Sequence, residues 1–261
     1  MPFHRYVALG DSFTEGVGDP DPLRPNGLRG WADRVAEVLS TQAGGDFGYA
    51  NLAIRGRKLP AIIDEQVGPA LALEPDLVTI HGGGNDVLRP RVDLDALAAR
   101  YDEAVGRLAA SGARVVLFTI ADPGINPVFK MIRGRTAVFN EWVREIADRH
   151  QATLVDMWRM RGWKVSEVMD EDRLHLNPVG HQAIAIEVLD ALAADHALAP
   201  LPLPDVVEQS ARERRAANLA WARQHAVPWV HRRLTGRSSG DGVLPKRPTL
   251  EPIAVATGSQ G

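Results

Sequence analysis

The chain has 261 residues, of which 45% are hydrophobic and 24% charged, so disordered and fibrous proteins are excluded. Its formal net charge of −3 offers no overall attraction to phosphate backbones, and we expect no nucleic-acid partner. The sequence contains no cysteine, which rules out disulfides, thiolate metal sites and a cysteine nucleophile.

The apolar stretches are short. None approaches the ~20 residues that a membrane-spanning helix needs, so no transmembrane segment is expected. Near the N-terminus only residues 6–9 form an apolar run, and Gly10-Asp11-Ser12 follows at once. A secretory signal needs a basic region and about 7–15 apolar residues. We therefore expect a cytoplasmic protein.

Short apolar runs alternate with helical patterns through the first 200 residues. Strands are expected at 5–9, 49–54, 76–81, 115–120 and 153–157, and helices at 31–40, 59–73, 94–110, 136–150 and 178–194. The alternation predicts a parallel sheet with helices on both faces. With right-handed crossovers, the expected fold class is α/β, a three-layer α/β/α sandwich around a five-stranded parallel sheet.

The pattern changes after Pro200. Prolines also occupy positions 202 and 204, residues 205–225 have a helical pattern, and the sequence from 235 onward is rich in Gly, Ser and Pro. The expected organisation is a catalytic domain over 1–199 and, over 200–261, a C-terminal helical extension with a loose tail.

The extension is basic. Residues 205–247 contain nine Lys and Arg against four acids, a net charge of +5. This surplus could dock an anionic partner or a membrane surface. We favour a solvated helix packed on the domain through Leu219, Trp221 and Trp229, and the sequence names no partner for it.

Ser12 is the candidate nucleophile. The tripeptide Gly10-Asp11-Ser12 directly follows the first expected strand, so the serine lies at the carboxyl edge of the sheet beside free backbone N–H groups. A serine after an aspartate is also a common helix cap, and the tripeptide alone does not distinguish the two roles.

A carboxylate and an imidazole are spaced for acid–base chemistry just before the last helix of the domain. Asp172 lies three residues before His175, close enough to accept the Nδ1 hydrogen on one turn and leave Nε2 free to take a proton from serine. The alternative is an ordinary surface loop. A metal site is not expected, because His175 and His181 would point to different sides of a helix and lack an acidic co-ligand.

Two further segments supply neutral hydrogen-bond donors at strand ends. Three glycines precede Asn85, letting the backbone turn sharply and bringing the side-chain amide to the sheet edge. Gly56, which ends the segment from Asn51, could lend its backbone N–H to an oxyanion or simply end a strand. The glycine-rich segment lacks the spacing of a phosphate-binding loop.

These four segments are complementary: a hydroxyl, an acid-oriented imidazole and two neutral donors. They resemble, in order, the conserved blocks of the SGNH (GDSL) hydrolase family, over about residues 5–185. Phe13 departs from the leucine in the family's four-letter name, at a position that packs rather than reacts. The G-x-S-x-G elbow of the α/β-hydrolases is absent.

The resemblance implies a flavodoxin-like sandwich that hydrolyses carboxylic esters without a cofactor or metal. It also implies Ser12 as nucleophile, His175 as base and Asp172 as its partner. The oxyanion hole would consist of the Ser12 and Gly56 amides with the Asn85 side chain.

Substrate preference is harder to read. The loop 123–135 carries Phe129 and Ile132, and we expect these side chains to form an apolar pocket for a short- or medium-chain acyl group. They could equally pack under their own loop. Arg89 could meet an anionic substrate group, although a solvated arginine is the more common case.

Rival functions remain open. An acyltransferase, a thioesterase or a carbohydrate acetylesterase would use the same serine. A non-catalytic binding protein would not need an imidazole aimed at a hydroxyl, and a nucleotide-binding regulator would need a phosphate loop.

Overall fold

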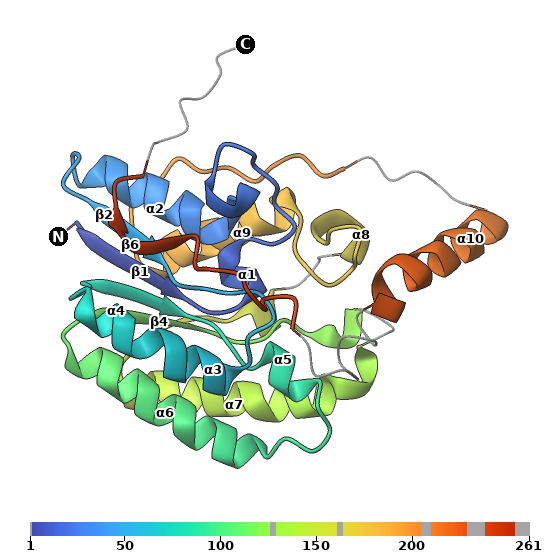
Figure 1. Ribbon diagram of the computed structural model, residues 1–261, viewed down its shortest axis with the longest axis horizontal. Helices are drawn as coiled ribbons and strands as arrows, with labels where there is room; N and C mark the ends of the chain where they lie inside the picture. Colours follow the sequence, from blue (N-terminus) through green and yellow to red (C-terminus); the bar gives the residue numbers. More distant parts are fainter. Residues whose placement is uncertain (1, 126–128, 161–163, 205–209, 229–237, 254–261) are drawn as a thin grey trace, which may run out of the picture.

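Six strands form one sheet, in the order β5-β4-β3-β1-β2-β6 (Figure 1). The computed structural model describes residues 2–125, 129–160, 164–204, 210–228 and 238–253. The strands are β1 (Arg5–Leu9), β2 (Gly48–Asn51), β3 (Leu77–Ile80), β4 (Arg114–Phe118), β5 (Thr153–Val155) and β6 (Arg247–Glu251). The first five run parallel in the flavodoxin-like order 2-1-3-4-5, which confirms the predicted fold class.

Helices cover both faces of the sheet. The longer ones are α2 (Gly30–Gln42), α6 (Leu94–Ala110), α7 (Arg133–Arg149) and α9 (Pro178–Ala191). The shorter ones are α1 (Ser12–Glu15), α3 (Leu59–Ile62), α4 (Gly68–Ala72), α5 (Gly84–Val87), α8 (Val165–Val168) and α10 (Ala211–Trp221). Figure 1 shows α2 and α9 on one face, and α3, α4, α6 and α7 on the other.

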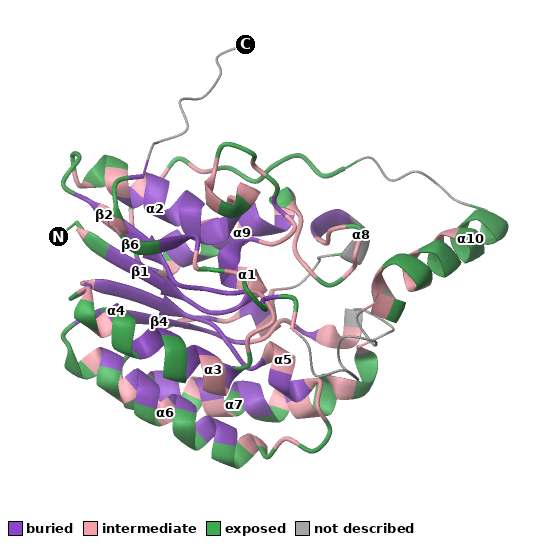
Figure 2. Ribbon diagram, viewed as in Figure 1, coloured by how far each residue is buried: buried purple, intermediate pink, exposed green. Residues whose placement is uncertain are grey.

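Strand β1 is the centre of both hydrophobic layers. Tyr6 and Ala8 belong to the buried cluster under α2 and α9, while Val7 and Leu9 belong to the cluster on the opposite face. All four are completely buried (Figure 2). This alternation follows from the two-residue period of a strand, and burial on both faces explains the continuous apolar run in the sequence.

The sixth strand corrects the prediction of a five-stranded sheet and a loose tail. Strand β6 pairs antiparallel with β2, and Ile253 just beyond it is buried in the core cluster under α2 and α9. Pro248 lies within β6, which is tolerated because β6 is an edge strand. The segment 238–253 therefore belongs to the sheet domain, and the boundary predicted at residue 199 does not hold for it.

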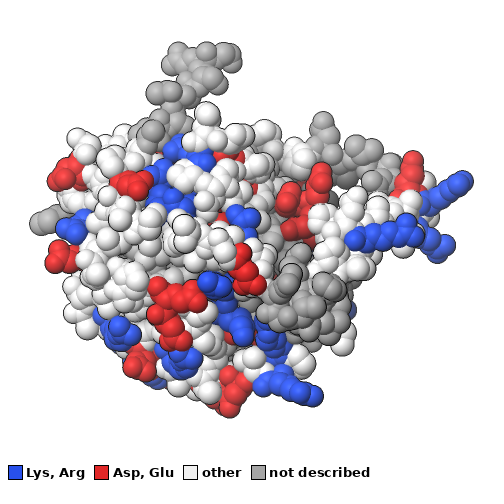
Figure 3. Space-filling view, in the orientation of Figure 1, with Lys and Arg blue, Asp and Glu red and all other residues white. Residues whose placement is uncertain are grey.

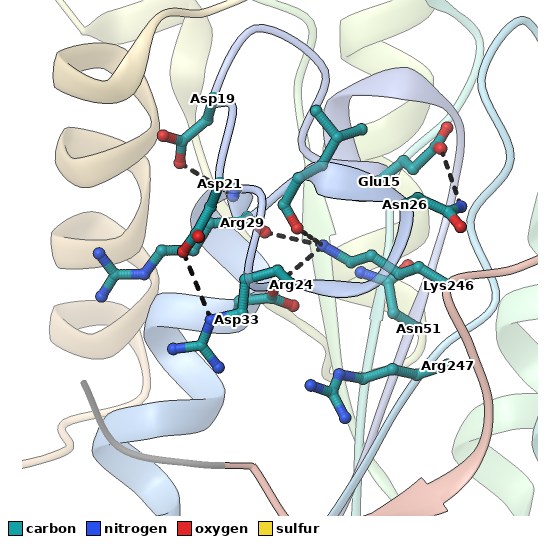
Figure 4. Close-up of polar contacts among 12 residues, drawn as sticks. Glu15, Asp19, Asp21, Arg24, Asn26, Arg29, Asp33, Asn51, Lys246 and Arg247 are labelled. Atoms are coloured by element: carbon teal, nitrogen blue, oxygen red, sulfur yellow. Dashed lines mark hydrogen bonds and ion pairs between the residues drawn. The ribbon is translucent and has the colours of Figure 1, made fainter.

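A buried ion pair anchors this returning segment. The Lys246 ammonium group donates to Asp33 of α2 at 3.1 Å and to the carbonyl oxygen of Arg29 at 2.7 Å (Figure 4). The side chains of Lys246 and Asp33 are both 0% exposed. Burial lowers the pKa of Lys246, and the adjacent carboxylate opposes that shift.

Helix α10 stands out from the body of the molecule and is largely exposed (Figures 1 and 2). Its arginines 212, 214 and 215 are exposed, and Lys and Arg side chains gather at its outer end in Figure 3. Leu219 is 54% exposed, so the predicted packing through this residue is wrong, whereas Trp221 is half-buried. Trp229 lies outside the described residues.

No helix within the described ranges is long and apolar enough to cross a membrane.

Replacing Lys246 with Met should destabilise the fold by about 3–5 kcal/mol, because it leaves the buried Asp33 carboxylate without its cation. The midpoint of urea unfolding measures the change. Lys130→Met, at an exposed lysine, is the matched control and should stay within about 0.5 kcal/mol. The double variant Asp33→Asn with Lys246→Met should recover part of the loss. An unchanged midpoint in the single variant would show that the ion pair does not anchor the segment.

Candidate active site

Ser12 is the first residue of α1, at the carboxyl end of the central strand. The chain turns there through Gly10, whose φ of 154° and close approach to Thr14 and the His81 carbonyl leave no room for a side chain. Asp11 caps α1 by accepting from the Phe13 N–H at 3.2 Å. The short helix thus fixes the Ser12 hydroxyl at the sheet edge, as the sequence predicts.

His175 contacts the serine directly. Its Nε2 lies 2.9 Å from Ser12 Oγ, and its Nδ1 lies 2.5 Å from Asp172 Oδ2. The other carboxylate oxygen of Asp172 accepts from the backbone N–H groups of Leu174 and His175, each at 2.9 Å. The fold therefore brings the three predicted residues into one chain of contacts.

The environment of Asp172 keeps its carboxyl group ionised. Burial alone would raise its pKa, but the hydrogen bond and charge of His175 and the two backbone donors outweigh it, and the pKa lies well below its usual range. An ionised partner holds the imidazole in the tautomer with hydrogen on Nδ1, leaving Nε2 free to accept.

The predicted oxyanion donors surround Ser12 but differ in their availability. Within the described part of the chain, the backbone N–H groups of Ser12 and Gly56 have no recorded acceptor. Asn85 is engaged instead: its Nδ2 donates to Asp11 Oδ2 at 3.0 Å and to the Arg57 carbonyl at 2.9 Å. Asn85 can therefore reach an oxyanion only by sharing one of these hydrogens.

A buried carboxylate that the sequence analysis did not single out joins the serine helix to the Gly56 turn. Glu15, at the end of α1, is fully buried and accepts from the Arg55 backbone N–H at 2.8 Å and from its guanidinium at 2.6 Å. The interaction fixes the residue before Gly56 relative to Ser12. In the sequence, the pair is visible only as an acidic residue three positions after Ser12 and an arginine directly before Gly56. Such a pattern is too common to predict an ion pair.

Other polar side chains tie the same loops to the sheet. Asn51 Nδ2 donates to the Thr14 carbonyl at 2.9 Å, so the residue that opens the second family block holds α1 in place. Gln66 brackets Gly10, accepting from its N–H at 2.8 Å and donating to its carbonyl at 2.9 Å. Phe13 packs against Trp31, as expected for a packing position.

His181 has a structural role. It is completely buried on α9, its Nδ1 accepts from the Trp31 N–H at 3.2 Å, and its Nε2 donates to the Val17 carbonyl at 3.2 Å. Burial lowers its pKa to about 4, so the ring is neutral near pH 7. No group of three His, Asp or Glu among the described residues is arranged to hold a metal ion.

The three residues predicted to shape specificity lie in different surroundings. Ile132 packs against the core on the α6 and α7 face, which is the packing alternative weighed for it. Phe129 is half-buried at the start of a 3₁₀ turn. Arg89 donates to the Asn85 carbonyl at 2.6 Å and lines an open hollow of about 280 Å³ beside Lys58.

A family model and several solved structures match this chain. The model of the GDSL-like lipase/acylhydrolase family matches residues 8–183. A search of curated protein sequences finds no match.

Similar solved structures include LAE5, an α/β hydrolase from the metagenome of Lake Arreo, Spain, at 24% identity and a TM-score of 0.62, covering 74% of this chain and 97% of LAE5. The acetyl xylan esterase AlAXEase matches at 22% identity and a TM-score of 0.58, covering 72% and 98%. The acetylxylan esterase Axe2 from Geobacillus stearothermophilus matches at 19% identity and a TM-score of 0.61, covering 75% and 98%.

The structural likenesses show a shared fold, and the family match spans the strand-end loops that carry Ser12, Gly56, Asn85 and His175. The chain belongs to the GDSL-like lipase/acylhydrolase family, a family of serine ester hydrolases.

Proposed function

We propose that Ser12 is the nucleophile, His175 the general base and Asp172 its orienting partner in hydrolysis of a carboxylic ester. The observation that carries the proposal is the 2.9 Å contact between His175 Nε2 and Ser12 Oγ, with Asp172 on the far side of the ring. A nucleophile, a base in contact with it and a group that orients the base are the required parts of an acyl-enzyme mechanism.

Each step uses a group in contact with the next. Ser12 Oγ attacks the ester carbonyl while His175 takes its proton, and the negative charge on the carbonyl oxygen is stabilised by the Ser12 and Gly56 N–H groups. The tetrahedral intermediate then expels the alcohol, which His175 protonates. Water, deprotonated by His175, attacks the acyl-enzyme, and the proton returns to Ser12 as the acid leaves.

Asn85 is the third proposed oxyanion donor. Because its two amide hydrogens are donated to Asp11 and the Arg57 carbonyl in the free enzyme, we assign its contribution to a three-centre hydrogen bond formed as the oxyanion charge develops. In the resting state the same bonds hold the Asn85 loop against Asp11, next to the nucleophile.

The proposed substrate is an ester with a short acyl chain. The hydroxyl groups of Ser238 and Ser239 lie where a Cβ atom of residue 56 would stand, and we infer that this segment narrows the approach to the Gly56 donor on one side. An acetylated carbohydrate is the second candidate, because the similar structures AlAXEase and Axe2 are acetylxylan esterases. Two Axe2 structures carry catalytic mutations at a serine and at a histidine, the residue types in contact here.

A separate proposal concerns where the enzyme acts and on what class of molecule. We propose action in the cytoplasm on a small-molecule ester, without a nucleic-acid partner. The net charge of −3 supports the last point, because it offers no overall attraction to phosphate backbones.

Ser12→Ala should reduce kcat on the order of 10⁶-fold, because it removes the nucleophile of a triad whose members act together. Hydrolysis of p-nitrophenyl acetate measures turnover, and mass spectrometry after fluorophosphonate treatment should locate the label on Ser12 of the parent enzyme alone. Ser40→Ala, on α2, is the matched control and should be active and labelled normally. Turnover retained in Ser12→Ala would contradict the assignment.

Acyl-chain length should decide the substrate class. Against p-nitrophenyl esters from acetyl to decanoyl, kcat/KM should be greatest at acetyl to butyryl and fall with each longer chain, if Ser238 and Ser239 narrow the space beside Gly56 as proposed. Acetylated xylooligosaccharides and acyl thioesters run in parallel, with alcohol acceptors added to detect transfer. Activity confined to acetylated sugars would favour the carbohydrate acetylesterase, and a maximum at decanoyl would contradict the short-chain proposal.

A further inference from the structure

Helix α10 contacts the loop that carries the catalytic acid and base. We define the acid–base loop as residues 170–176. The indole Nε1 of Trp221 donates to the carbonyl oxygen of Asp172 at 2.9 Å. The Arg173 guanidinium lies over the Trp221 ring, 5.1 Å from its centre, and donates to Asn218 Oδ1 at 2.8 Å. Two residues of α10 thus hold two consecutive residues of the loop.

These contacts fall where the loop backbone is strained. Arg173 has a φ of 57°, in the left-handed region that a residue with a side chain adopts reluctantly. That turn lets the Asp172 carboxylate fold back onto the N–H groups of Leu174 and His175. A strained conformation persists only where its surroundings fix it, and α10 supplies surroundings on the outer side of the loop.

The chain beyond α10 returns to the opposite side of the site. Ser238 and Ser239 pack on Gly56, and a Cβ atom at buried Gly240 would collide with the Arg55 carbonyl. The segment 238–240 therefore packs directly on the turn that presents the proposed oxyanion donor. A few residues later, the buried ion pair of Lys246 and Asp33 holds the segment against α2 (Figure 4).

We propose that the C-terminal extension is a positioning element of the active site, with Trp221 as a positioning residue that acts through Asp172 and Arg173. The segment 238–240 supports the Gly56 turn in the same way. The inference rests on the proposed function, because it assumes that Asp172 and His175 perform the proton transfer. Trp221 contacts the backbone of the loop and is assigned no contact with substrate.

Three variants on α10 test the role of Trp221. Trp221→Ala removes both the donor and the ring, Trp221→Phe keeps a ring under Arg173, and Leu219→Ala is the matched control at an exposed position of the same helix. The readouts are kcat, KM and the proton NMR signal of the His175 Nδ1 hydrogen shared with Asp172, including its exchange with water. The NMR signal can be measured without turnover. A lower free energy of unfolding alone would not change the signal in protein that remains folded.

Trp221→Ala should lower kcat by about 10- to 100-fold with KM within about twofold, since a misplacement near 1 Å costs up to about 10²-fold. In Trp221→Ala, the Nδ1 hydrogen of His175 should exchange faster with water than in the parent enzyme. Trp221→Phe should lower kcat about fivefold, which corresponds to the loss of one neutral hydrogen bond. Leu219→Ala should match the parent enzyme in every readout. If Trp221→Ala fails to fold, the hydrogen exchange and kcat of Trp221→Phe decide the question.

A separate variant tests the contact of the segment 238–240 with the Gly56 turn. Gly240→Ala should lower kcat and leave the Nδ1 signal unchanged, because the added methyl group pushes on Arg55 and not on the acid–base loop. Gly134→Ala, on α7 with open space around it, is the control.

The outcomes separate this inference from the proposed function. If Ser12→Ala is inactive and Ser12 is labelled, while Trp221→Ala keeps the kcat and Nδ1 exchange of the parent enzyme, the positioning role is wrong. If Ser12→Ala remains active, the proposed function fails first.

Discussion

The active-site geometry depends on a 2.9 Å contact between two side chains that are 163 residues apart in the sequence, Ser12 Oγ and His175 Nε2. Ser12 is fixed by the central strand, while His175 precedes α9, which packs against α2 on the same face of the sheet. The distance between them therefore depends on how α9 lies against α2, which in turn packs against α1. His181 of α9 contributes to that packing, since its ring joins the Trp31 N–H of α2 to the Val17 carbonyl after α1.

His181 performs this task only while it is neutral. Protonation would place a second N–H against the Trp31 N–H, and burial, which lowers the pKa of His181 to about 4, prevents this near neutral pH. Unfolded histidine takes up its proton near pH 6.5, so between about pH 6.5 and 4 the unfolded chain binds a proton that the folded chain does not. Stability contributed by this residue is lost as the pH falls through that window.

Charged pairs surround the loops that carry the site. Glu15 with Arg55, Asp19 with Arg34, and Asp33 with Lys246 each contain a carboxylate that is at least 95% buried. Figure 4 shows the last of these pairs. Such pairs add little net stability compared with an apolar core, but removal of one partner is costly, so they favour one arrangement of the loops. In this chain they specify where the Gly56 turn and the C-terminal segment lie relative to Ser12.

The sequence predicted the parts that follow from periodicity. The five parallel strands, the long helices and the contacts of His175 with Ser12 and with Asp172 are found as expected, because strand ends meet at one sheet edge. Strand β6 was missed, since residues 247–251 contain a proline and two charges and lack an alternating pattern. The contacts of Trp221, Glu15 and Lys246 were missed because buried polar pairing depends on tertiary packing. A pocket formed by Phe129 and Ile132 stays a prediction, because side-chain patterns alone do not say where a loop lies.

The most direct test of this account is a crystal structure of the enzyme after reaction with a fluorophosphonate, which leaves a tetrahedral phosphonate in place of the first intermediate. We predict phosphorus bonded to Ser12 Oγ, one phosphonyl oxygen within hydrogen-bonding distance of the Ser12 and Gly56 N–H groups, and His175 Nε2 facing the leaving-group position. A phosphonyl oxygen directed away from both N–H groups, or an adduct on another residue, would contradict it.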